Sequence, residues 1–289
     1  MTVSCRHSLA QPTKSTPTHG AGWRDRALPT FGRISFRTLF RPVETVSGDI
    51  YTILPLDERR IAVTVIDATG HGMPAGLLAG AARHALGAAR SASDATLGPR
   101  AALERINRAL LEAELIECEF VAAVYAIIDV RSGLVRLSRG GAPYPIVRRA
   151  DGACQLVDVP GGILGVCPEP RCGEVSFVLN PGDALLLYTD GLEHVVQHTD
   201  SSPAAPAAPD RWISGADWYR GLGRHGAESA LEDVARRHTR LARLAAPLDD
   251  LTVLAALAGV TSPVRKSARA SQSSDAVSAA AGIRPLPSR

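Results

Sequence analysis

One short stretch, IAVTVIDATGHG at residues 61–72, limits the possible folds of this chain more than any other. Its first six residues are almost all apolar at both alternating sets of positions, which predicts a strand covered on both faces. The strand ends at Asp67, and Gly70 and Gly72 then allow backbone angles that other residues disfavour. A carboxylate held at the end of a rigid strand suits a metal ligand or a catalytic acid. It equally suits a residue that caps a strand-to-helix turn, and this stretch alone does not separate the two interpretations.

Three further aspartates share this setting. Asp49 in SGD, Asp190 in YTDG and Asp249 in DDLT each border an apolar strand. Taken singly, each is best interpreted as a turn or cap residue, because aspartate favours turns. If all four converge, two carboxylates about 4 Å apart at an effective dielectric constant of about 20 repel each other by roughly 4 kcal/mol. Such a cluster must take up protons or bind cations.

Ligation by oxygen atoms alone predicts hard divalent ions, Mg²⁺ or Mn²⁺. Two such ions can activate a shared water for attack on a phosphoryl group. Phosphate monoesters hydrolyse extremely slowly without catalysis, so this chemistry needs strong electrostatic help. The four aspartates therefore predict a phosphohydrolase, provided that they meet in the fold.

The order of the expected elements predicts an α+β fold. Two strands come first, two adjacent helices follow, and a run of hairpin-linked strands leads to a third helix and a last strand. This order predicts a central antiparallel β-sandwich of two sheets flanked by helices. The expected strands span 49–54, 61–67, 120–130, 134–139, 144–149, 174–179, 184–189 and 253–257, the expected helices span 73–90, 100–116 and 227–245, and a loop is expected at 197–210.

The sequence divides into three segments. We expect a flexible leader at 1–35, one folded domain at 36–260 and a disordered basic tail at 261–289. The net charge of +3 hides a contrast, because each terminal segment has five basic residues and one acid, a net +4, which leaves −5 for the domain. An acidic domain argues against nucleic-acid binding and disfavours a carboxylate-only nuclease.

Cysteine usage and hydropathy indicate a cytoplasmic protein. The five cysteines are scattered, without a CxxC pair or a Cys/His run that could bind zinc. The sequence shows neither the apolar segment of a signal peptide nor a run long enough to span a membrane. We therefore expect a reducing compartment and no membrane contact.

Six short motifs occur in an order that resembles one known family. They are SGDIY, IDATGHGMPAGLLAG, FVAAVYAIID, PGGILGV, LNPGDALLLYTDGLEHV and DDLTVL. Their order is similar to that of the metal-dependent (type 2C, PPM) serine/threonine protein phosphatases. The closer resemblance is to their bacterial branch, the stage II sporulation protein E-type domain, which includes regulators of stress sigma factors. It extends from about Ser35 to Val260 and implies the same helix-flanked β-sandwich.

The resemblance also implies a site. Asp67 would bridge two divalent ions, Mn²⁺ or Mg²⁺, and the carbonyl oxygen of Ala68 would join Asp49 on one of them. Asp190 and Asp249 would hold the other ion. Asp67, Asp190 and Asp249 would thus be the catalytic residues. The implied reaction is one-step hydrolysis of phosphoserine or phosphothreonine by a metal-activated hydroxide, without a phosphoenzyme.

Three further residues are expected to surround these ligands. Asp250 would steady a metal-bound water, and Gly191 follows Asp190 directly. His71 allows two interpretations, a proton donor to the leaving group or an exposed turn residue. Arg41 is the nearest candidate in sequence for a phosphate-binding arginine.

The chain also departs from the family pattern. Ser47 replaces a frequent glycine, Thr52 replaces an acid, and a common histidine is absent from residues 139–143. None of these positions is a metal ligand in the family, so we expect activity to survive. The departures nevertheless motivate an alternative, a catalytically silent phosphatase-like module that sequesters a signalling partner.

The resemblance suggests partners without identifying them. The substrate would be a bacterial regulatory phosphoprotein such as an anti-sigma-factor antagonist. The two helices after Asp67 would form a regulatory pair that responds to an activating partner. The small residues of the helix at 73–90 suit either a homodimer face or internal packing, and the sequence leaves both open.

Overall fold

The computed structural model describes residues 28–88, 97–113, 119–200, 216–244, 248–259 and 283–285. These residues form two sheets in which all strand pairs are antiparallel. One sheet has the order β2-β3-β4-β5-β8 and the other has the order β1-β10-β9-β6-β7-β11. The strands are β1 (Ile34–Arg41), β2 (Asp49–Pro55), β3 (Arg60–Ala68), β4 (Val121–Asp129), β5 (Leu134–Gly140), β6 (Ile146–Arg148), β7 (Cys154–Val157), β8 (Glu174–Val178), β9 (Ala184–Tyr188), β10 (Leu251–Ala258) and β11 (Ile283–Pro285).

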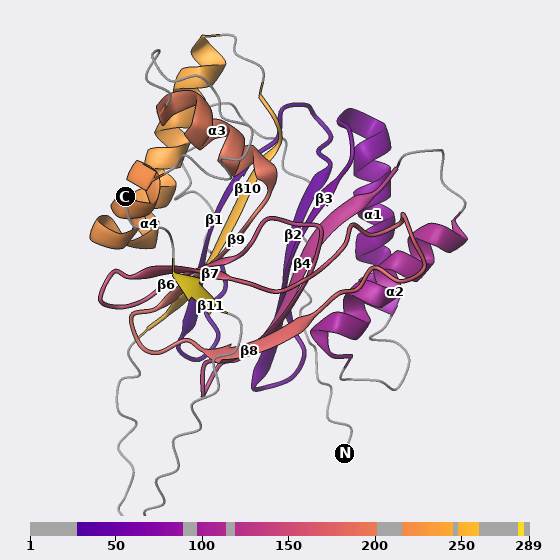
Figure 1. The fold of residues 1–289 in the computed structure, drawn as a ribbon, viewed down its shortest axis with the longest axis horizontal. Helices are drawn as coiled ribbons and strands as arrows, with labels where there is room; N and C mark the ends of the chain where they lie inside the picture. Colours follow the sequence, from indigo (N-terminus) through magenta and orange to yellow (C-terminus); the bar gives the residue numbers. More distant parts are fainter. Residues whose placement is uncertain are drawn as a thin grey trace, which may run out of the picture.

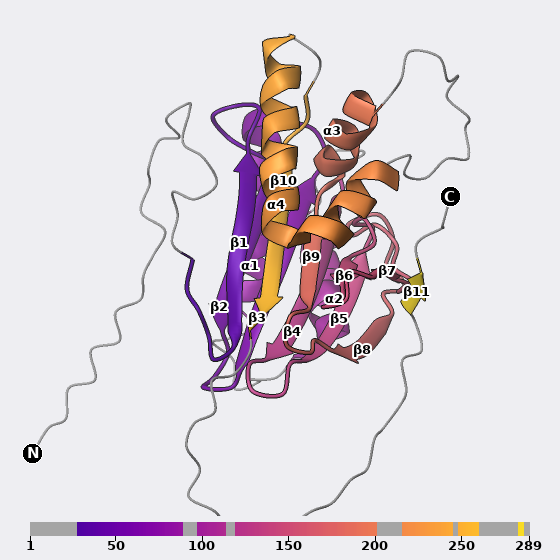
Figure 2. The same cartoon turned by 90° about the vertical axis from the view of Figure 1, so that its left-hand side faces the viewer.

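Helices cover the outer face of each sheet (Figures 1 and 2). Helices α1 (Gly72–Ala88) and α2 (Pro99–Glu112) pack on the five-stranded sheet, and α3 (Asp190–Asp200) and α4 (Ala216–Arg243) pack on the other sheet. The result is a four-layer arrangement of helices, sheet, sheet and helices. This arrangement confirms the predicted α+β fold with a central β-sandwich.

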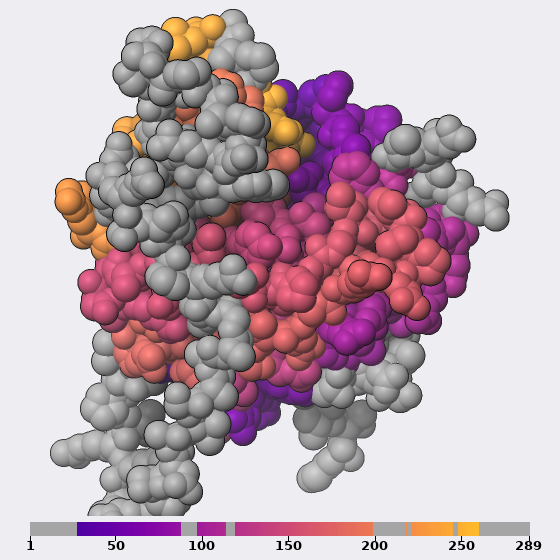
Figure 3. Space-filling model, in the orientation of Figure 1, coloured from indigo at the N-terminus to yellow at the C-terminus, as the bar shows by residue number. Residues whose placement is uncertain are grey.

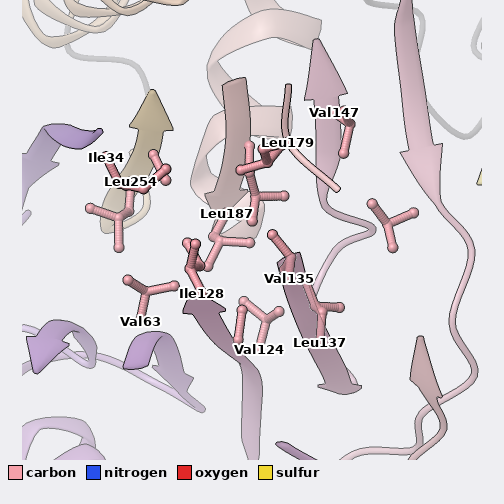
Figure 4. Packing of buried hydrophobic residues seen from close by; sticks show 14 of the residues in the cluster. Ile34, Val63, Val124, Ile128, Val135, Leu137, Val147, Leu179, Leu187 and Leu254 are labelled. Atoms are coloured by element: carbon pink, nitrogen blue, oxygen red, sulfur yellow. The ribbon is translucent and has the colours of Figure 1, made fainter. Parts of the chain in front are cut away.

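Three apolar clusters hold the layers together. The first lies between the sheets and is almost entirely aliphatic (Figure 4), the second lies beneath α3 and α4, and the third lies beneath α1 and α2. Strand β3 contributes to two of them, because Val63 and Val65 face the other sheet while Ala62 and Ile66 face α1 and α2. The two-sided apolar pattern of this strand therefore has its expected cause.

The small residues of α1 serve internal packing. Ala75, Ala79 and Ala82 are buried against the sheet. A Cβ atom on Gly76 would lie only 2.2 Å from Cγ1 of Val46, so a larger residue could not let the preceding loop pass so close. The exposed apolar side chains of this helix are Met73 and Leu77.

Several boundaries differ from the sequence prediction. Residues 190–200 form α3, a helix that was not predicted, so the loop expected at 197–210 is wrong for residues 197–200, and the rest of it lies outside the described residues. Strand β7 was not predicted either. Helix α4 begins at Ala216 rather than at residue 227, because two helical segments meet at Gly226, where φ is 83°. The apolar periodicity of the sequence predicted only the helical segment after Gly226. The kink at Gly226 interrupts the helical spacing, so the segment before it was not recognised as part of the same helix.

The chain termini depart from the expected segments where they are described. Strand β1 begins at Ile34, two residues before the expected domain start, and β11 pairs with β7 inside the segment expected to be disordered. The rest of the predicted leader before residue 28, and the rest of the tail, lie outside the described residues. None of the described helices is both long enough and apolar enough to cross a membrane.

The connection between β7 and β8 crosses the face shown in Figure 3, where the middle of the chain (magenta to salmon) fills the surface. Asn107 of α2 anchors this connection, because its amide donates to the carbonyl oxygens of Cys167 and Pro168 and accepts from Gly165 N. A surface cavity of about 780 Å³ lies in the same connection. None of the four predicted aspartates lines it.

The core between the sheets gives a stability prediction. Leu137 of β5 is fully buried there, so Leu137→Ala should lower the free energy of unfolding by about 2–5 kcal/mol. Leu77→Ala is the matched control, because Leu77 is 68% exposed and its truncation should change stability by less than about 0.5 kcal/mol. Denaturant unfolding followed by circular dichroism measures both, and equal effects would contradict the proposed core.

Candidate functional site

The four predicted aspartates lie at one edge of the sandwich. β2 begins at Asp49, which is the direct cross-strand partner of Asp67 near the end of β3. On the other sheet, α3 begins at Asp190 just after β9, and Asp249 lies two residues before β10. A backbone hydrogen bond of 3.0 Å from Thr189 N to Thr252 O brings these last two segments together.

Glycines allow the close approach of backbones at this edge. A Cβ atom on Gly191 would lie 2.1 Å from the carbonyl oxygen of Asp250, so only glycine lets the first turn of α3 contact this segment. Gly48 similarly faces the carbonyl oxygen of Ala68. Gly70 and Gly72 have φ values of 86° and 70°, which confirms the glycine turn predicted after β3.

Asp49 is the most deeply buried of the four acids, with 2% of its surface exposed. Its Oδ2 accepts hydrogen bonds from Thr189 Oγ1 at 2.8 Å and from Thr252 Oγ1 at 2.7 Å. Burial raises the pKa of Asp49 to about 7, and the two hydroxyls oppose that shift by stabilising the charged form.

Asp67 and Asp190 share a hydrogen bond between their carboxyl groups. Burial, together with the negative charges of Asp49, Asp190 and Asp249, raises the pKa of Asp67 to about 9. Burial of its carboxyl group and the charge of Asp249 also raise the pKa of Asp190, although that residue as a whole is exposed at the rim. Burial and mutual repulsion thus disfavour the charged form of both carboxyl groups.

This donor set fits a hard divalent cation. The interacting groups are carboxylates, and a cation bound among them would relieve their repulsion. Within the described residues, no three acidic, histidine or cysteine side chains are gathered closely enough to hold an ion by themselves. Backbone oxygen atoms or water would therefore have to complete the coordination shell.

Asp250 makes contacts that the sequence did not suggest. Its Oδ1 accepts from Val43 N at 2.7 Å, and its Oδ2 accepts from Ser47 Oγ at 2.7 Å and from Gly48 N at 2.9 Å. Both oxygen atoms therefore hold the loop that leads into Asp49. The hydroxyl of Ser47, where the family often has glycine, also accepts a 3.1 Å hydrogen bond from Asp49 N.

The two remaining candidates, His71 and Arg41, interact with residues outside the acidic cluster. The His71 side chain is 80% exposed and contacts Glu44 through Nδ1 and Oε1 at 2.5 Å, which favours the exposed-turn interpretation. Arg41 lies near α4, where burial lowers the pKa of His238 and the charge of Arg41 lowers it further. Leu39, on the same face of β1, packs beneath α3 and α4, so Arg41 also lies on the helix-covered face of its sheet, with Leu251 as its cross-strand partner.

The sequence analysis missed Thr189 and Thr252, the two residues that contact Asp49. A signal was present, because each threonine lies within three residues of a predicted aspartate, in YTDG and in DDLT. Nothing local indicated that both hydroxyls point toward the same carboxylate, since Asp49 lies 140 and 203 residues away from them.

Comparison with known proteins identifies the family of the chain. The family model described as stage II sporulation protein E (SpoIIE) matches residues 57–258. The phosphoserine phosphatase RsbP of Bacillus subtilis is 22% identical over 163 residues, which are 55% of this chain and 40% of that protein. Protein IcfG of Synechocystis sp. is 22% identical over 189 residues, 57% of this chain and 30% of IcfG. The chain thus spans less than half the length of these relatives.

Solved structures show the same fold. The RsbU and RsbW domains of Rv1364c from Mycobacterium tuberculosis match with a TM-score of 0.63 and 24% identity, over 81% of this chain and 62% of that one. The PP2C phosphatase domain of SpoIIE from Bacillus subtilis matches with a TM-score of 0.62 and 20% identity, over 80% and 63%. RsbX, solved in complex with magnesium, matches with a TM-score of 0.56 and 16% identity, over 77% and 94%.

The crowded carboxylates give a stability prediction that requires no substrate. Asp190→Asn removes a negative charge but keeps an oxygen that can accept the hydrogen bond from Asp67. In EDTA at pH 8 the variant should melt about 2–4 °C higher than the wild type, which corresponds to about 1 kcal/mol. Mn²⁺ should raise the melting temperature of the wild type more than that of the variant.

Differential scanning calorimetry measures these shifts. Glu58→Gln is the control, because Glu58 is an exposed acid in the turn between β2 and β3. It should change neither the metal-free melting temperature nor the response to Mn²⁺. A metal-free Asp190→Asn protein that melts below the wild type would show that repulsion does not dominate at this edge.

Proposed function

This chain belongs to the stage II sporulation protein E (SpoIIE) family, and we propose that it is a metal-dependent protein serine/threonine phosphatase. The family match covers residues 57–258, which include three of the four aspartates of the cluster. The fold is that of PP2C phosphatase domains. The proposed reaction is hydrolysis of phosphoserine or phosphothreonine in a regulatory phosphoprotein.

The observation that carries this proposal is the meeting of four aspartates from both sheets at one edge of the sandwich, where Asp49 is the cross-strand partner of Asp67. The negative charges of Asp49, Asp190 and Asp249 raise the pKa of Asp67 there. A folded protein gains nothing in stability from such repulsion. The cluster is therefore best explained by a positively charged occupant that is present when the protein works.

The residues at this edge would bind the metal ions and fix their positions. Mn²⁺ or Mg²⁺ would be held by the four aspartates and the carbonyl oxygen of Ala68, as in the family pattern. When bound, two such ions activate water for attack on a phosphoryl group and reduce its negative charge. The protein itself supplies fixed carboxylates on two sheets, so that little rearrangement accompanies the reaction.

The names of the relatives support a signalling substrate. RsbP is called a phosphoserine phosphatase, and the structure from Mycobacterium tuberculosis contains RsbU and RsbW domains. For this chain we propose a bacterial phosphoprotein such as an anti-sigma-factor antagonist. A catalytically silent module that only sequesters a partner is less well supported, because the predicted acids are all present and interact.

Activation would involve the helices that cover β3. In α1 the exposed side chains of Met73 and Leu77 lie within ten residues of Asp67, and the alanines of the helix pack on the same sheet. An activating partner, or a second copy of the chain in a homodimer, would contact these exposed apolar residues. Light scattering of the wild type and of a Met73→Glu, Leu77→Glu variant tests the homodimer.

Hydrolysis of p-nitrophenyl phosphate tests the proposed activity. The full chain should turn over the substrate with Mn²⁺ or Mg²⁺ and lose turnover in EDTA. Asp67→Asn should lower kcat/KM by about 100-fold or more, because it removes a charge from the centre of the cluster. Glu58→Gln should match the wild type.

The silent-module alternative predicts a different result. A chain that binds a phosphoprotein tightly in Mn²⁺, yet hydrolyses neither that protein nor p-nitrophenyl phosphate, would contradict the proposed activity. Phosphate release from a phosphorylated anti-sigma-factor antagonist, measured beside binding by calorimetry, separates the two functions.

A further inference from the structure

The carboxylate of Asp49 is held asymmetrically. Both hydrogen bonds that the described residues donate to it end on Oδ2, one from Thr189 and one from Thr252. The hydroxyl of Thr189 also accepts a 3.1 Å hydrogen bond from Thr252 N, which leaves its own hydrogen atom to donate to the carboxylate. Oδ1 is thus the oxygen left for another ligand.

The two threonines are themselves fixed. Their side chains are almost completely buried, with 1% and 0% exposed. Thr189 N donates to Thr252 O at 3.0 Å, so backbone and side-chain hydrogen bonds join the two residues. They belong to the six-stranded side of the sandwich, whereas Asp49 begins β2 of the opposite sheet. The contact therefore connects the two sheets at the candidate site.

The backbone of Asp49 is fixed separately. Asp250 accepts hydrogen bonds from Ser47 Oγ and Gly48 N, and Ser47 Oγ accepts from Asp49 N. Only the side-chain torsions of Asp49 remain to be set. The two threonine hydroxyls determine which carboxylate oxygen turns toward them, and they leave the other one available.

We propose that Thr189 and Thr252 are positioning residues that hold Asp49 so that Oδ1 alone contacts a divalent cation. This inference rests on the proposed function, because it assumes that the cluster binds such a cation. It assigns to each threonine a role in metal affinity that goes beyond filling space in the core.

Isosteric variants separate the hydroxyl from the packing. Thr189→Val and Thr252→Val keep the shape of each side chain and remove the donor, and Thr→Ser variants keep the donor. Thr64→Val is the matched control, because Thr64 is also fully buried in a strand and its hydroxyl has no hydrogen-bond partner. Mn²⁺ binding by titration calorimetry and melting by circular dichroism are measured on the full chain.

Each Thr→Val variant should bind Mn²⁺ about tenfold more weakly at one site, because it loses a hydrogen bond to a charged group that orients a ligand. The serine variants should recover wild-type affinity. Thr64→Val should bind as the wild type does. In assays of hydrolysis, the valine variants should need more Mn²⁺ for half-maximal rate and recover most of kcat at saturating Mn²⁺.

Valine variants that fold and bind Mn²⁺ with wild-type affinity would overturn the inference and leave the proposed function intact. A wild-type chain that binds neither Mn²⁺ nor Mg²⁺ would overturn both. If a valine variant does not fold, the cysteine variant at the same position replaces it, because a thiol is similar in size and a much weaker donor. Unchanged affinity in that variant would equally count against the positioning role.

Discussion

Repulsion among buried carboxylates is the constraint on which this edge of the sandwich depends. Charges of one sign lose hydration on burial and repel each other at short range. Burial, and to a smaller extent the neighbouring negative charges, accordingly raise the pKa values of Asp49 and Asp67. A fold can keep such a cluster only if rigid packing elsewhere offsets it, and the three apolar clusters supply that packing.

The surrounding residues accommodate the acids in different ways. Asp49 receives two hydroxyl donors, the pKa values of Asp67 and Asp190 are raised, and Asp250 satisfies both of its oxygen atoms within the loop before Asp49. Asp250 is thus a structural support for the site. The serine at position 47 strengthens that support, because glycine in its place would offer no hydroxyl to join Asp250 to the backbone of Asp49.

The sandwich architecture explains why the acids come from distant parts of the sequence. A single hairpin brings together residues of neighbouring segments, as β2 and β3 do for Asp49 and Asp67, but it cannot reach the segments around Asp190 and Asp249. Two facing sheets place the start of β2 beside the start of β10, which lies about 200 residues later. Relative motion of the sheets would therefore change the separation of the ligands, and the buried contact between Asp49 and the two threonines opposes such motion.

The sequence by itself determined the local structure and the chemistry. The two-sided apolar pattern of residues 61–66 predicted a buried strand, and the four acids at strand ends and the ordered motifs predicted an α+β sandwich that suits divalent ions. These properties depend on period, turn residues and side-chain chemistry, which act over a few positions. The boundary of α3, the kink at Gly226 and strand β7 escaped prediction because tertiary packing sets them.

Only the tertiary structure decided which oxygen atoms remain available to a ligand. It directed Asp250 to the loop at 43–48, two threonines to one oxygen of Asp49, and His71 to the surface beside Glu44. Each of these contacts depends on strand register and on the meeting of segments far apart in the chain. Side-chain orientation across two sheets has no local signature, so the residue types were readable from the sequence and their partners were not.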